Sequence, residues 1–195
     1  MTKEEKKKLK LLEYMKLSST NRNMKFISLI YDDIHVVNEY GENLLHVFTS
    51  EKYDEEKCFA LIKTLLINGV NPNHLDNCKY DFIQTAIDTG YSETFVMNCI
   101  REALKHSYNV NNQDEDGDTI MHNAINADDY KSGLIDLFNL LLLNGYNAKK
   151  LNKAGKGIDD LMFETRKYNN AYKRKVIIEF DKELSRPDNL KVYKR

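Results

Sequence analysis

The chain has 195 residues, of which 42% are hydrophobic and 30% charged, and a formal net charge of −1 at pH 7. This composition is typical of a folded protein, and the 2 prolines and 8 glycines exclude collagen-like and proline-rich classes. The length suits one domain over residues 1–195 that buries a core without disulfides or a structural metal.

The cysteines and the N-terminus indicate the cellular compartment. Cys58, Cys78 and Cys99 form no Cys-x-x-Cys pair, which excludes zinc-knuckle and thioredoxin-like motifs and favours reduced thiols. The first residues are charged and contain no apolar stretch of a secretory signal, and no apolar run is long enough to span a bilayer. We expect a cytoplasmic protein with no membrane partner.

The first predicted elements are two helices within residues 3–30. Thr2 and Glu5 have the spacing of a capping box at the start of the first helix. Apolar side chains on the predicted inner faces of the two helices are Leu11, Leu12, Met15, Phe26, Ile27 and Ile30.

An interval of 38 residues organises the rest of the chain. Two independent features keep this interval, a polar turn and a residue that follows an apolar stretch. The turns begin at Asn38, Asp76, Asp114 and Asn152, and the second feature falls at Gly69, Ser107 and Gly145. The interval predicts repeats at 38–75, 76–113 and 114–151, and a last repeat that continues into a C-terminal helix at 152–185.

Each repeat contains two apolar stretches with the spacing of amphipathic helices, such as 44–48 and 59–67 in the first repeat. One helix pair is too small to bury these stripes alone, so neighbouring repeats must stack. Gly69 and Gly145 stand where a helix C-terminus favours a left-handed residue, and Ser107 at that position should reduce stability.

The last predicted element is an amphipathic helix. Its apolar positions are Tyr172, Val176, Ile177, Phe180 and Leu184. Residues 186–195, with a proline and several basic residues, are expected to form a frayed tail.

The repeats resemble the ankyrin repeat, whose unit reads Asp-x-x-Gly-x-Thr-Pro-Leu-His-x-Ala, then a helix pair, then Gly-Ala-Asp-Val-Asn. The second repeat is degenerate, because Lys79, Asp81 and Gln84 stand at the Gly, Thr and His positions. The interval exceeds the family's period of about 33 residues, and we expect the added length between the two helices of each repeat. The third repeat matches best, at Asp114, Gly117, Thr119, Ile120, Met121, His122 and Ala124.

The resemblance implies an all-α solenoid of stacked helix pairs, with residues 1–37 as an N-terminal capping repeat and a C-terminal capping helix. It implies that His46 and His122 are structural and connect one turn to its neighbour. It also implies partner binding through the turn tips and the residues around the first helices. Carried over by position, these are Glu39, Tyr40, Glu42, Glu51, Asn77, Tyr80, Asp88, Glu115, Asp116, Asp118 and Asn126.

Motifs for catalysis or metal binding are not found. The carboxylates of Asp114, Asp116 and Asp118 match the first three ligands of a calcium loop, but Thr119 and Ile125 stand where that loop needs Gly and Glu. The chain has no His-Glu-x-x-His, no glycine-rich phosphate loop and no nucleophile elbow. We predict no catalytic residue, no metal and no cofactor.

The net charge conceals an uneven distribution. Residues 26–148 carry 20 acidic against 7 basic residues, whereas residues 149–195 carry 14 basic against 7 acidic. Residues 1–25 carry 8 basic against 3 acidic. An acidic middle favours a basic partner.

We interpret the chain as a non-catalytic protein-interaction module, an inhibitor or immunity-type protein that binds a basic protein partner and is a monomer on its own. Two alternatives stay open: a bacterial or viral effector that engages a host protein, and an enzyme or ligand-binding regulator with a cleft among the repeats. Nucleic-acid binding through the basic ends is disfavoured by the acidic middle.

Overall fold

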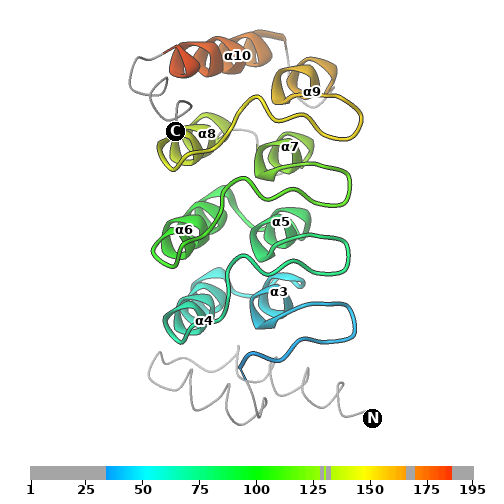
Figure 1. The fold of residues 1–195 in the computed structure, drawn as a ribbon. Coiled ribbons are helices and arrows are strands. Elements are labelled where there is room, and N and C mark those ends of the chain that lie inside the picture. The colour runs from blue at the N-terminus through cyan, green and yellow to red at the C-terminus, as the bar shows by residue number, and fades with distance from the viewer. Residues whose placement is uncertain (1–33, 128–129, 131–132, 166–169, 186–195) are drawn as a thin grey trace.

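The computed structural model describes residues 34–127, 130, 133–165 and 170–185, and in these ranges the chain forms eight helices and no strand (Figure 1). The predicted all-α class is therefore confirmed. The two helices predicted within residues 3–30 and the tail at 186–195 lie outside the described residues. The helices are α3 (Leu44–Thr49), α4 (Glu55–Ile67), α5 (Phe82–Asp88), α6 (Glu93–Leu104), α7 (Ile120–Asn126), α8 (Leu134–Leu143), α9 (Ile158–Glu164) and α10 (Asn170–Leu184).

The helices stand in two parallel rows (Figure 1). The short helices α3, α5, α7 and α9 contact one another in that order, and α4, α6, α8 and α10 form the second row. Each short helix also packs against the longer helix that follows it. The turns that precede the short helices project together from one side of the stack (Figure 1).

The short helices begin at side chains that cap them. The Asn43 side chain accepts hydrogen bonds from the backbone N–H groups at the start of α3, and Asp81 does the same for α5. Helices of six or seven residues are unstable alone in water, so packing between the rows must hold them.

The core runs continuously between the rows, as repeat stacking requires. It extends into α10, where Val176 and Phe180 are fully buried and the Phe180 ring lies 4.0 Å from the Phe138 ring of α8. The amphipathic helix predicted at the C-terminus is thus present. Within the described ranges, no helix has the length and apolar character needed to cross a membrane.

The ends of the longer helices show the predicted left-handed residue. Backbone φ is 85° at Gly69, 62° at Ser107 and 84° at Gly145. Ser107 is therefore a side-chain-bearing residue in a conformation that favours glycine.

The connections at 50–54 and 89–92, between the helices of the first two pairs, lie where added length was predicted. They are joined to each other, because the Tyr91 hydroxyl donates to the Glu51 carbonyl oxygen at 2.7 Å and accepts from the Tyr53 N–H at 3.0 Å. The added residues are therefore part of the contact between repeats.

Candidate protein-binding surface

The four turns have the same internal geometry. The first residue of each turn accepts two hydrogen bonds on its side-chain Oδ1, from the N–H groups two and four residues later, at 2.8–3.0 Å. This arrangement explains why Asn or Asp recurs at 38-residue intervals, since both can accept these bonds. The accepting residues are Asn38, Asp76, Asp114 and Asn152.

The turns also bond directly to their neighbours. The N–H of Asn77 donates to the Tyr40 carbonyl oxygen at 3.1 Å, and the N–H of Glu115 donates to that of Cys78 at 3.0 Å. The same bond follows from Lys153 to Asp116, at 2.8 Å. We call the segments 37–42, 75–80, 113–118 and 151–156 the tip row, because these bonds connect them into one ladder.

Glycine at the fourth position of the turn permits this close approach. Gly41 has φ 77°, and a Cβ atom there would lie 2.5 Å from Asn77 Oδ1. Gly117 has φ 78°, and its Cβ would lie 2.9 Å from the Lys153 nitrogen. Lys79 takes the same position in the second repeat with φ 63°, which is strained for a residue with a side chain.

Buried polar side chains of α3, α5 and α7 bond to the second, third and fourth tips. His46 Nε2 lies 2.9 Å from the Tyr80 carbonyl oxygen, and His122 Nε2 lies 3.2 Å from that of Lys156. In the second repeat, Gln84 Nε2 donates to the Asp118 carbonyl oxygen at 3.1 Å. Burial lowers the pKa of both histidines, which keeps them neutral at pH 7.

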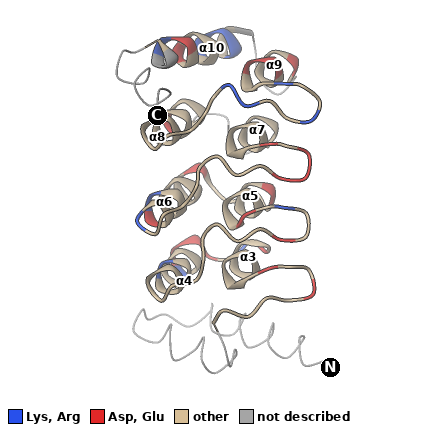
Figure 2. Ribbon diagram, viewed as in Figure 1, with Lys and Arg blue, Asp and Glu red and all other residues tan. Residues whose placement is uncertain are grey.

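Eight of the predicted partner-binding residues meet along the tip row. Tyr40 is 65% exposed, and it stands beside acidic side chains of its own turn. Figure 2 shows acidic residues on the turns that precede α3, α5 and α7. Glu39, Asn77, Glu115 and Asp116 are exposed, and Glu42, Tyr80 and Asp118 are half-buried.

The other three predicted residues lie in a different place. Glu51 follows α3, and Asp88 and Asn126 end α5 and α7. They are therefore at the opposite ends of the short helices, about 10 Å from the tips for a seven-residue helix. The sequence-based prediction had joined two separate rows into one line.

Carboxylates lie near two titratable side chains of the second tip. Burial raises the pKa of Tyr80 to about 12, with further contributions from Asp114 and Asp88. The Cys78 thiol has a raised pKa because the Asp76 and Glu115 carboxylates disfavour its thiolate. Carboxylates therefore contribute to both shifts, with little burial at Cys78 and beside burial at Tyr80.

Two features of the tip row were missed in the sequence. The fourth tip is basic (Figure 2), with Lys149, Lys150, Lys153 and Lys156 in and beside it. Apolar side chains are exposed just before three of the turns, at Val37 (46%), Leu75 (36%) and Leu151 (56%). The three apolar residues share one position of the 38-residue interval, and the lysines stand where the third repeat has Asn or acidic residues, so comparing the repeats position by position would have found both sets.

The geometry gives no support to a calcium loop at Asp114. Its Oδ1 accepts from the N–H groups of Asp116 and Asp118, and its Oδ2 accepts from Asn123 Nδ2 at 3.1 Å. Among the residues with described positions, no group of three or more His, Cys, Asp or Glu side chains could hold a metal ion.

No protein-family model matches the chain, and no curated protein shows significant similarity to it.

Proposed function

We propose that the chain is an ankyrin-type repeat protein that binds a basic protein partner, without catalysis, through the tip row. The observation that carries this proposal is the ladder of backbone hydrogen bonds that joins the acidic first and third tips into one continuous surface, through a second tip that carries Asp76 and Lys79. A surface fixed in advance loses little conformational entropy when a partner binds.

The ankyrin-type assignment rests on three observations. Helix pairs stack in two rows, the turns project from one side, and a His or Gln of α3, α5 and α7 bonds to the next turn. The family's unit places its Thr and His where Thr119 and His122 stand, and Thr119 Oγ1 lies 2.8 Å from His122 Nδ1.

The chemistry of the tips indicates the kind of partner. Exposed carboxylates at Glu39, Glu115 and Asp116 would steer a basic surface to the row, and exposed Tyr40 offers an apolar anchor among them. Such a surface can cover a basic active site or binding site, so we infer an inhibitor or immunity-type role in the cytoplasm.

A differential capture experiment tests the proposal. The bait carrying Glu39→Lys, Glu115→Lys and Asp116→Lys reverses three exposed tip charges, and none of these side chains bonds within the turn. Glu42 and Asp118 are less suitable, because their carboxylates accept bonds from Asn38 and Asn152. Proteins captured from the native cell are quantified on wild-type and variant baits.

The matched control bait carries Glu56→Lys, Asp136→Lys and Asp181→Lys, which make the same charge change at exposed sites on the longer helices. We expect one basic protein to be retained by the wild-type and control baits and lost by the tip variant. Capture that is unchanged by the tip variant, or a retained partner that is acidic, would contradict the proposal.

A further inference from the structure

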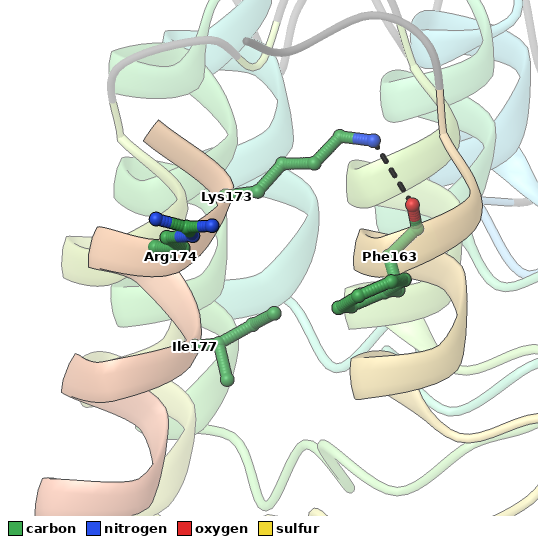
Figure 3. Close-up of a pocket in the computed structure, with 4 residues that line it drawn as sticks. All are labelled: Phe163, Lys173, Arg174 and Ile177. Carbon is green, nitrogen blue, oxygen red and sulfur yellow. Dashed lines mark hydrogen bonds between the residues drawn. The ribbon is translucent and has the colours of Figure 1, made fainter. Parts of the chain in front are cut away.

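The terminal helix pair forms a groove that the tip row does not include. Its volume is about 210 Å³, and its lining residues are Phe163 of α9 and Lys173, Arg174 and Ile177 of α10 (Figure 3). Pockets that enclose small molecules have roughly 300–1,000 Å³. The groove therefore suits one side chain of a peptide better than a whole cofactor.

The inner surface of the groove is apolar. Phe163 is 76% exposed, and Figure 3 shows its ring facing the Ile177 side chain across the gap between the helices. The terminal unit of a repeat protein normally has a polar outer face, because no neighbour covers it. An exposed aromatic ring beside a groove at this end is a departure from that rule.

The rim of the groove is cationic. Lys173 Nζ donates to the Phe163 carbonyl oxygen at 2.9 Å, across the gap and close to the C-terminal end of α9 (Figure 3). Arg174 is exposed and makes no hydrogen bond or ion pair in the described part of the chain. Its planar guanidinium is therefore free to take a carboxylate in two parallel hydrogen bonds.

We propose that the groove between α9 and α10 binds an acidic peptide segment of a protein partner. An apolar side chain of the segment enters between Phe163 and Ile177, and a neighbouring carboxylate pairs with Arg174. The chain's own tail is a poorer occupant, because residues 186–195 contain four basic residues and one acidic residue. The site is independent of the tip row and has the opposite charge preference.

Fluorescence polarisation on the full chain tests this site. The probe is a labelled octapeptide in which one leucine is flanked on both sides by aspartate and glutamate. Two comparison peptides replace the leucine with alanine, or every acidic residue with its neutral amide, asparagine or glutamine. We expect about tenfold weaker binding without the leucine and about tenfold or more weaker binding of the neutral peptide.

Two variants assign the binding to the groove. Phe163→Ala and Arg174→Glu change exposed side chains, and each should weaken the acidic peptide about tenfold or more. Lys63→Glu is the matched control, because it makes the same charge change as Arg174→Glu at an exposed site on α4. Thermal unfolding followed by circular dichroism checks that all three variants fold.

The outcomes separate the proposal from its alternatives. Equal loss of binding in Lys63→Glu and Arg174→Glu would mean that net charge alone attracts the peptide, and would overturn the site. Equal binding of the neutral peptide would also overturn it, because the carboxylates would then contribute nothing. A dimer in light scattering that Phe163→Ala dissociates would assign the groove to a second copy of the chain.

Discussion

The Tyr108 hydroxyl donates a 2.7 Å hydrogen bond to Oδ2 of Asp81, a carboxylate that has no exposure to solvent. The same pair recurs 38 residues later as Tyr146 and Thr119, whose oxygens lie 2.8 Å apart. One repeat thus buries an ionisable carboxyl group where the next buries a hydroxyl. Burial raises the pKa of the Asp81 carboxyl, although its hydrogen bonds act in the other direction.

Asp81→Thr should change how stability depends on pH. Because the Asp81 pKa is raised on folding, the folded state binds this proton more tightly than the unfolded state, and stability falls as pH rises above about 4. Thr removes this loss, so the free energy of unfolding of the variant, relative to wild type, should be higher at pH 7 than at pH 4. Urea denaturation at the two pH values measures it, and a difference that stays constant would contradict the prediction.

The two buried histidines should make the protein less stable in mild acid. Their pKa values are lowered by burial, so their contribution is complete above about pH 6.5 and is lost as pH falls through the folded-state values. His46→Gln with His122→Gln copies the natural Gln84 and should retain stability at pH 7.5 within about 0.5 kcal/mol, with a smaller loss at pH 5. Denaturant midpoints at both pH values test this. If the variant loses as much stability at pH 5 as the wild type does, groups other than the two histidines cause the loss.

Ser107→Gly should stabilise the protein. The left-handed conformation at φ 62° costs a residue with a Cβ atom roughly 1 kcal/mol, and glycine avoids that cost. The reciprocal change Gly145→Ser should destabilise by a similar amount, because a Cβ there would meet no atom within 4 Å and only the backbone conformation changes. Thermal unfolding should give midpoint shifts of opposite sign, and shifts of the same sign would be inconsistent with this explanation.

Gly117→Ala should destabilise more than Gly155→Ala. The two glycines occupy the same turn position with φ of 78° and 73°, so the conformational cost is matched at about 1 kcal/mol. A Cβ at Gly117 would lie 2.9 Å from the Lys153 nitrogen, whereas one at Gly155 meets nothing within 4 Å. Denaturant unfolding measures the difference. Equal losses in the free energy of unfolding would show that the contact between the tips adjusts to the added methyl group at no energetic cost.

Cys78 offers a direct measurement of the potential at the tips. Cys58 and Cys99 are buried, so Cys78 alone of the three cysteines is exposed to an alkylating reagent. The Asp76 and Glu115 carboxylates raise the pKa of its thiol and lower its thiolate fraction. Glu115→Lys should therefore speed the reaction with iodoacetamide at pH 8, and a rate no different from wild type would argue against an acidic tip.

The repeating features of the fold were predictable from the sequence because each repeat makes the same bonds. Every 38 residues an Asn or Asp accepts bonds from two backbone N–H groups, and a left-handed residue follows a helix. Each of these roles restricts the residue types that can occupy its position. The positions of the turn tips followed from the same interval. The distance between the tips and Glu51 could not be predicted in this way, because the tips precede the short helices whereas Glu51 follows one.

Features that differ from one repeat to the next were not predictable. Asp81 looked like a degenerate position, and its partner Tyr108 lies 27 residues away with no counterpart in the first repeat, where Val70 stands. The groove at Phe163 depends on how α10 packs against α9, since α10 replaces a regular second helix. The spacing of residues in the sequence does not determine how closely these two helices pack.

The backbone hydrogen bonds that join neighbouring tips have a mechanical consequence. Each of these bonds is shared by two repeats, and side-chain bonds such as those of His122 to Lys156 and of Asn152 to Asp118 accompany them. A repeat at the end of the stack can therefore separate by breaking this group of hydrogen bonds and its apolar contact. A ligand that binds two adjacent tips spans the hydrogen bond between them and must dissociate before the two repeats can separate. Occupancy of the surface would thus make distant repeats open together, and amide hydrogen exchange would slow even at sites the ligand does not touch.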